Sequence, residues 1–196
     1  MDNLQVARSF LSLCCNLSEE AFSLSTHMWK EKSFHKGEIY SKEGRVCRKA
    51  AFIVGGYFRT YKLDEDGQQK NLFFHAPGQN LVSFVSFVQQ TPCDHYIEAI
   101  TDASVISITY DELQQLYDSS VEWSKVGRLF AEFAYKLLEE RFLGYYGLSP
   151  EERYLKLLQE APDIFNVIPL KEISSFLGVE FQSLCRIRKR ISGRRS

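Results

Sequence analysis

The stretch LKEISSFLGVEFQSLCRIRKRI, residues 170–191, lies near the end of the 196-residue chain. Lys171 to Leu177 has the pattern of one helix, and Gly178 stands where the chain must turn sharply. A second helix is expected from Glu180 or Phe181 to Ile191. The apolar residues that would pack the two helices together are Ile173, Leu177, Val179, Leu184, Ile187 and Ile191. Ser174 supplies a small side chain for the close approach, so the stretch predicts a helix-turn-helix.

Burial of this apolar set leaves polar residues on the outer face of the second helix. They are Gln182, Ser183, Arg186 and Arg190. Arg can pair with the edge of guanine and Gln with that of adenine, which is what reading of the major groove requires. Phosphate contacts are expected from Lys171, Arg188, Lys189, Arg194 and Arg195. A helical hairpin with a solvated basic face is the alternative, but the combined motif and charge pattern favours DNA binding.

The charges are divided unevenly along the chain, although the net charge is only −1. Residues 1–147 carry 15 Lys and Arg against 19 Asp and Glu, whereas residues 148–196 carry 9 against 6. Six of these cations follow Cys185 without an acid among them. This asymmetry is typical of a nucleic-acid-binding end, although basic tails also occur on proteins that bind nothing.

Composition places the chain among ordinary globular proteins, with 44% hydrophobic residues, 15 Phe and 10 Tyr. The sequence contains no run of eighteen apolar residues and no secretion signal, and its odd number of five Cys points to a reducing compartment. We therefore expect a cytoplasmic protein without a membrane partner.

Short strands with turns between them are expected from about Phe34 to Ile108. Ala51 to Val54 has the composition of a buried strand, and Gly55-Gly56 permits a sharp reversal. A turn at residues 64–67 and a returning strand from Asn71 to His75 follow. Further strands are expected at HYIEAI and ASVISIT. This spacing predicts an antiparallel roll or barrel.

A long helix with two apolar faces is expected from about Ser120. One face contains Trp123, Val126, Phe130, Phe133 and Leu137, and the other contains Ala131, Ala134, Leu138, Phe142 and Tyr145. One face can pack on the chain's own strand domain, and the other favours the same helix of a second copy. A single broad core stripe in a monomer is the alternative. A new helix then begins at Ser149-Pro150, where Glu152 completes a capping box, and ends at Pro162.

These segments together resemble the cyclic AMP receptor protein and FNR (CRP/FNR) family of bacterial transcription regulators, especially its short Bacteroidetes-type members. The similar segments are KEISSFLGVEFQSLCRIRKRI, EERYLKLL, KGEIY, FIVGGYFRTY, DEDGQQ and IEAI. The resemblance covers nearly the whole chain in the right order. It implies a homodimer with a β-roll sensor domain (1–119), a long dimerisation helix (120–147) and a winged-helix-type DNA reader (148–196). RNA polymerase is a further candidate partner.

The sequence departs from that family at two places near the basic helix. Glu180 and Phe181 stand where the family often has a Thr or Ser cap followed by Pro, and Glu is the poorer cap. The chain also stops soon after Ile191, so we expect the wing hairpin to be reduced or absent. The fold class is therefore α+β, with a jelly roll like that of cyclic-nucleotide-binding domains, a long helix and a helix-turn-helix.

The resemblance also points to a ligand pocket, where family members hold the ribose with a Gly-Glu pair and the cyclic phosphate with an Arg-Ser pair. These pairs correspond here to Gly78-Gln79 and to Cys93-Asp94. Cys93 cannot make the bidentate contact of arginine, and Asp94 would repel a phosphate. Cyclic AMP is therefore not expected to bind. The candidate pocket residues are Gly78, Gln79, Val82, Ser83, Cys93 and Asp94, which leaves open another small-molecule effector or none.

Enzyme and metal readings have weak support in the sequence. The four His are scattered without an H-x-H pair, and the Cys lack the clustered spacing of an iron–sulfur site. Neither a P-loop nor a dinucleotide fingerprint is present. Two hypotheses remain: a dimeric, non-enzymatic regulator that reads a palindrome in double-stranded DNA, or a ligand-sensing or protein-interaction module of the same fold that has lost DNA binding.

Overall fold

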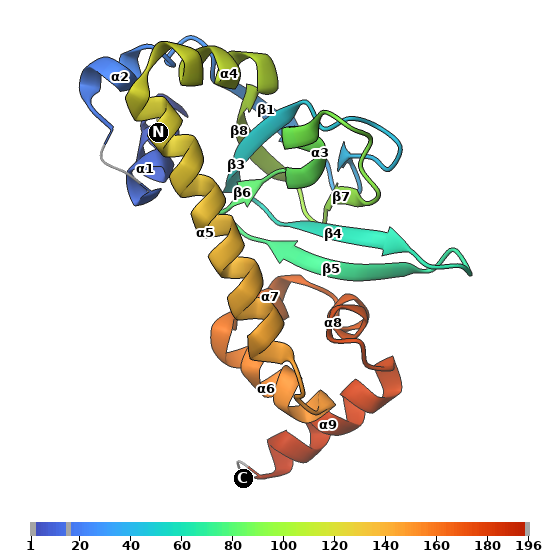
Figure 1. Ribbon diagram of the computed structural model, residues 1–196. Helices are drawn as coiled ribbons and strands as arrows, with labels where there is room; N and C mark the ends of the chain where they lie inside the picture. Colours follow the sequence, from blue (N-terminus) through green and yellow to red (C-terminus); the bar gives the residue numbers. More distant parts are fainter. Residues whose placement is uncertain (1–2, 15–16, 195–196) are drawn as a thin grey trace. The chain divides into compact units, whose positions relative to one another are not determined.

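The computed structural model describes residues 3–14 and 17–194 of the chain (Figure 1). The described residues fall into two compact units. The first comprises the residues up to Thr60 together with Phe74–Leu138, and the second comprises Tyr61–Phe73 together with the residues from Glu139 onward.

Two four-stranded sheets form the β-roll. One sheet has the order β1 (Lys30–Phe34), β8 (Ala103–Thr109), β3 (Lys49–Gly55) and β6 (Asn80–Leu81). The other has the order β2 (Ile39–Ser41), β7 (Tyr96–Ala99), β4 (Phe58–Leu63) and β5 (Gln69–His75). Strand β8 pairs antiparallel with both β1 and β3, and β2 pairs antiparallel with β7. The antiparallel roll predicted from the sequence is therefore confirmed.

Strand β8 is apolar on both faces because both faces are covered. Ala103 and Val105 belong to the core inside the roll, which also contains Phe34, Ile53, Phe58, Leu81 and Ile97. Ile106 and Ile108, which point to the other face, pack with residues of α1 (Asn3–Cys14), α4 (Tyr110–Ser119) and α5 (Val121–Tyr145). A strand buried on both faces loses the strict alternation of apolar and polar residues, which explains why Val105 and Ile106 are adjacent and both buried.

The predicted reversal at Gly55-Gly56 separates β3 from β4. Gly56 has a φ of 80°, in the region that favours glycine. A Cβ atom there would lie 2.4 Å from the carbonyl oxygen of Asp102. Both the backbone conformation and the close approach therefore require glycine at this position.

Helix α4 is a feature that the sequence prediction missed, because residues 110–119 lie between the expected strands and the expected long helix. Thr109 caps this helix: its Oγ1 accepts a hydrogen bond from the backbone N–H of Glu112, while the Glu112 carboxylate accepts one from the Thr109 N–H. The spacing Thr-x-x-Glu is a recognisable capping box and could have revealed the helix. Two shorter helices, α2 (Glu19–Ser23) and α3 (Phe84–Gln89), complete the first unit.

The second unit contains the outer part of the β4–β5 hairpin, the C-terminal end of α5, and the helices that follow. These are α6 (Pro150–Glu160), α7 (Ile164–Val167), α8 (Leu170–Leu177) and α9 (Phe181–Arg194). The predicted capping box of α6 is present, since the Oγ of Ser149 accepts from the N–H of Glu152 and the Glu152 carboxylate accepts from the N–H of Ser149. Among the described residues, no strand follows α6.

Candidate nucleic-acid interface and sensor site

Helices α8 and α9 form the predicted helix-turn-helix. Gly178 ends α8 in the left-handed conformation, with φ 65° and ψ 36°. Its N–H donates to the carbonyls of Ser174 and Ser175, and the N–H of Val179 donates to Ser174. This closure satisfies carbonyls that the end of a helix leaves without partners, and it explains why glycine is needed there.

The apolar residues predicted to join the two helices do so. Ile173, Leu177, Leu184 and Ile187 are buried, while Val179 and Ile191 are half-buried. Tyr154 and Leu157 of α6 and Ile164 and Ile168 are buried as well. Ser174 is only 4% exposed, which agrees with its predicted place at the close approach of the helices. The position of α9 is thus fixed by a core of its own.

The outer face of α9 presents Gln182, Arg186 and Lys189, all exposed and spaced four and three residues apart. Cys185, an exposed free thiol, lies on the same face. The Arg186 guanidinium donates to the Oγ of Ser183 over 3.1 Å, so the half-buried Ser183 orients a neighbour on this face. The structure therefore brings together one amide and two cations on the surface of a well-supported helix.

The remaining predicted contacts differ in their surroundings. Arg190 makes an ion pair with Glu151 of α6, so part of its charge is already neutralised. Arg188 is exposed but lies on another side of α9, and Lys171 is exposed in the first turn of α8. Arg194 is the last residue described, and Arg195 lies outside the described residues.

Arg153 supports the end of α8 in a way that the sequence did not indicate. Its Nη1 donates to the carbonyl of Leu177 over 3.2 Å, and its Nε donates to the carbonyl of Leu148 over 3.0 Å. A cation is favourable at a helix C-terminus, where unpaired carbonyls carry partial negative charge. No local pattern marks this role, because the two carbonyls come from different parts of the chain.

The outer part of the β4–β5 hairpin is hydrogen-bonded to α8. The backbone N–H of Asn71 donates to the Oγ of Ser175 over 3.0 Å, and the Asn71 side-chain amide donates to the carbonyl and the carboxylate of Glu172. Ser175 in turn donates to the carbonyl of Gln69. Asn71 is only 4% exposed, so these bonds are shielded from water. They fix the first helix of the helix-turn-helix.

Arg141, near the end of α5, completes this contact. Its guanidinium lies 4.4 Å from the ring centre of Phe73 and 4.3 Å from that of Phe176. Its Nη2 also donates to the carbonyl of Leu72 over 2.6 Å. Burial lowers the pKa of Arg141 from its ordinary value, although an arginine remains charged. The three residues form a cation–π stack that joins α5, the hairpin and α8.

Gly78 and Gln79, two of the residues predicted to form a ligand pocket in the roll, belong to one turn. The Gln79 side chain accepts a hydrogen bond from the backbone of Ala76, within its own turn, and Gly78 has the φ of 87° that this turn requires. Ser83 is buried at the start of α3, and its hydroxyl has no partner among the described residues. Val82 is half-buried and lines a separate apolar cavity.

Cys93 and Asp94 lie in different surroundings from each other. The buried Cys93 thiol donates to the carbonyl of Lys42 over 3.0 Å. The Asp94 carboxylate is exposed and lies 2.9 Å from the imidazole of His95. Arg59, the basic residue of the roll that could face inward, is buried and ion-paired with Glu98 at 3.2 Å. A phosphate in the roll would have to compete with Glu98 for this guanidinium.

Comparisons with known proteins define the fold class of this chain. Residues 31–120, somewhat less than half of the chain, match the family model described as the cyclic nucleotide-binding domain. No curated protein matches the sequence significantly.

Solved structures of similar fold include three bacterial proteins. FixK2 from Bradyrhizobium japonicum shares 23% identity over 85% of each chain, with a TM-score of 0.71. The catabolite activator protein of Thermus thermophilus shares 16% identity, covering 93% of this chain and 87% of its own, with a TM-score of 0.57. The c-di-GMP responsive global regulator CLP of Xanthomonas campestris shares 12%, covering 90% and 92%, with a TM-score of 0.66. At these identities the likeness concerns the fold, and it confirms the predicted order of β-roll, long helix and C-terminal helices.

Within residues 3–14 and 17–194, no group of three or more His, Cys, Asp or Glu is placed to hold a metal ion. None of the helices described is long and apolar enough to cross a membrane.

Proposed function

We propose that this chain is a cytoplasmic, non-enzymatic transcription regulator that binds double-stranded DNA as a homodimer. The observation that carries the proposal is the face of α9, where Gln182, Arg186 and Lys189 project from a helix-turn-helix with a buried core. These side chains can read base edges and contact phosphates in the major groove. The resemblance to short members of the CRP/FNR family supports the same reading, as do the solved neighbours described as an activator protein and a global regulator.

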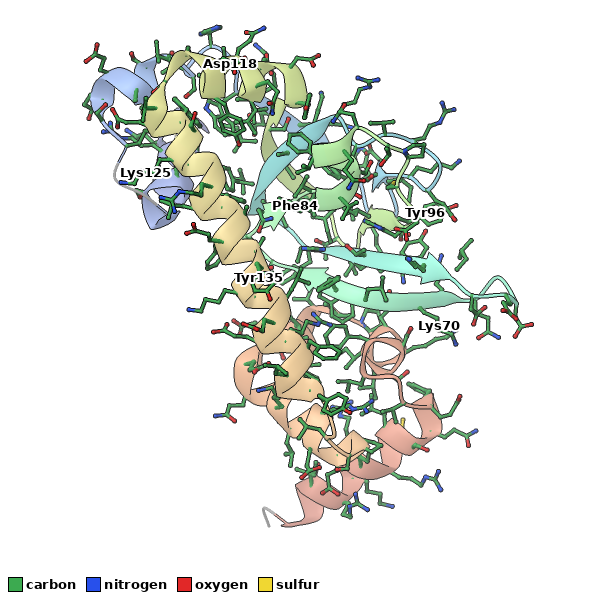
Figure 2. All side chains as sticks on the ribbon, in the orientation of Figure 1. Lys70, Phe84, Tyr96, Asp118, Lys125 and Tyr135 are labelled. Carbon is green, nitrogen blue, oxygen red and sulfur yellow. The ribbon has the colours of Figure 1, made fainter. Side chains whose placement is uncertain are left out.

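The dimer is proposed to form through α5. Trp123 and Val126 are buried and Phe130 packs against Phe52, with ring centres 5.8 Å apart, so this part of the first face is used within the chain. Another stripe is exposed along the same helix: Ala131, Tyr135, Leu138 and Phe142. Spacings of four, three and four residues are those of a helix–helix seam. Figure 2 labels Tyr135, whose side chain is 68% exposed.

Measurement of DNA binding with single substitutions tests the proposal. Bound DNA is first selected from a random library, and binding to the selected site is then followed by fluorescence anisotropy at several salt concentrations. A dimer should select a palindrome with half-sites about 34 Å apart, one turn of the duplex. Arg186→Ala should cost roughly 1–3 kcal/mol per half-site and relax the preference at one base pair.

Lys189→Ala should weaken binding to all sequences and reduce the slope of log K against log salt by about one per half-site. Lys36→Ala, which removes an exposed cation from the first unit, serves as the matched control. If Arg186→Ala changed neither affinity nor base preference, α9 would not be the reading helix. If the unmutated chain selected no DNA at all, the alternative of a sensing module without DNA binding would hold.

A further inference from the structure

An apolar cavity of about 340 Å³ lies in the first unit, outside the core of the roll. The residues that line it come mainly from α1, β3, β6, β8, α3, α4 and α5, elements that are labelled in Figure 1. Phe52, Phe87, Trp123 and Phe130 are among the side chains that line it. Of the pocket residues suggested by the sequence, only Val82 lines this cavity, so it is a different site.

The chemistry of the walls selects an uncharged occupant. No charged residue is found among the described side chains that line the cavity. A phosphate or carboxylate placed there would lose its hydration without gaining a cation, which is costly. The cavity therefore excludes cyclic nucleotides and other anions and favours a neutral molecule.

Three polar groups are available to orient such a molecule. Asn80 and Gln114, both half-buried and both with an amide side chain, are among the residues that line the cavity. Tyr117 contributes a phenol, and burial raises the pKa of Tyr117 to about 12, so it remains a hydrogen-bond donor at neutral pH. The ring of Tyr117 lies over Gly127, where an added Cβ atom would be 2.7 Å from Cζ. Because Gly127 has no side chain, the Tyr117 ring can pack directly against α5 at this position.

The size of the cavity fits a small organic molecule. Ligand pockets typically measure about 300–1,000 Å³, and an apolar cavity of about 150 Å³ can already bind benzene. Phe84 and Val88 line the cavity and are 42% and 52% exposed, so they mark its opening. Phe84 is labelled in Figure 2 at the start of α3. An occupant can therefore enter past α3 without unfolding the domain.

We propose that this cavity is a binding site for a small, uncharged molecule with one to three rings and one or two hydrogen-bonding groups. The occupant contacts Trp123, Val126 and Phe130 on the helix that carries the proposed dimer face. That the bound molecule acts as an effector rests on the proposed function. That the cavity binds it does not. The test below therefore uses no DNA, and its failure would leave DNA binding untouched.

The neutral fluorescent probe N-phenyl-1-naphthylamine, which has aromatic rings and one N–H donor, tests the site on the full chain. One probe should bind per chain, with a rise in fluorescence on transfer into an apolar site. Val82→Trp should weaken binding at least about tenfold, because the indole would occupy the cavity. Val85→Trp is the matched control: Val85 lies three residues further along the chain, in α3, is 64% exposed and does not line the cavity. Circular dichroism confirms that both variants fold.

A second readout needs no substitution. Trp29 and Trp123 are the only two tryptophans of the chain, and both line the cavity. After incorporation of 5-fluorotryptophan, both ¹⁹F resonances should shift on addition of the probe. Equal binding to Val82→Trp and Val85→Trp, or unchanged ¹⁹F resonances at saturation, would place the probe elsewhere and overturn the proposal. A lack of any binding would overturn it as well.

Discussion

At the scale of single residues, Arg141 shows how one cation can join three elements. It stacks between Phe73 and Phe176 and donates to a backbone carbonyl, so it contributes through both charge and planar shape. Lysine keeps the charge but has no planar group that can stack on both rings. Arg141 is therefore a position where the two basic residues are not equivalent.

Arg141→Lys should destabilise the contact between the hairpin and α8 by about 1–2 kcal/mol. Hydrogen exchange followed by mass spectrometry measures the effect, because peptides covering 61–73 and 170–177 should exchange roughly 5–30 times faster. Arg128→Lys provides the control, since Arg128 makes only an exposed ion pair with Glu132 and should change exchange little. Equal effects of the two substitutions would contradict the role given to the stack.

Glu180 stands at the capping position of α9, where glutamate is not a preferred residue. Its carbonyl accepts the first helical hydrogen bond, from the N–H of Leu184 over 3.0 Å, so it occupies the capping position. Glu180→Ser should stabilise α9 by about 1 kcal/mol, because Ser is a preferred cap. Hydrogen exchange in α9 measures this gain. Glu180→Gln, which removes the charge without adding a good cap, should not slow exchange, and a similar gain in both variants would refute the capping argument.

At the scale of elements, α5 has a buried part and an exposed part. Trp123 and Val126 pack within the first unit, whereas Leu138 and Phe142 are 55% and 68% exposed. Phe130 is in contact with Phe52, so a charged residue at position 130 would disturb the chain's own core as well as any seam.

Leu138→Glu should convert the proposed dimer into a monomer, because a buried charge without a partner is costly at a helix seam. Sedimentation velocity at micromolar concentration measures the change. Lys125→Glu, an exposed substitution on the same helix, should leave the dimer intact. A monomeric unmutated chain would remove both the dimer and the reason to expect a palindrome.

The helix-turn-helix is an element that depends on contacts outside itself. Its apolar core and Gly178 are local, but Arg153 satisfies the end of α8 and Asn71 binds Glu172 and Ser175 from the hairpin. Asn71 and Ser175 are 104 positions apart in the chain. The orientation of the first helix is therefore set by residues that no helical pattern can reveal.

At the scale of the whole molecule, the charges around the β-roll determine whether this fold can hold a cyclic nucleotide. Cys93 is buried against the carbonyl of Lys42, Asp94 is paired with His95, and Arg59 is paired with Glu98. A cyclic phosphate would meet a carboxylate and would have to break an existing ion pair.

We therefore expect no binding of cyclic AMP or cyclic GMP at micromolar concentration, as measured by isothermal titration calorimetry. Loss of a bidentate cation and gain of a like charge each cost on the order of a few kcal/mol in a partly buried site. Every 1.4 kcal/mol corresponds to about tenfold in affinity, so the dissociation constant would rise from the micromolar to the millimolar range or beyond. Micromolar binding of either nucleotide would show that Arg59 can leave Glu98.

Many of the helices, strands and turns of this protein can be predicted from the sequence, because the patterns that specify them are local. The period of apolar residues, the capping box at Ser149 and Glu152, and the turn at Gly178 all act within a few residues, and each is present in the structure. The strands were found from similar short patterns. Helix α4 was missed although its capping box at Thr109 and Glu112 was equally local.

Only the tertiary structure decided which charges are free and where a cavity lies. The pairing of Arg190 with Glu151, that of Arg59 with Glu98, and the cap provided by Arg153 join residues that are far apart in the chain. The apolar cavity is formed by segments from α1 to α5, and the sequence of each segment by itself has the pattern of an ordinary core segment. Local hydrogen bonding and periodicity determine the elements, but packing between distant elements determines the partners of each charge and the spaces left unfilled.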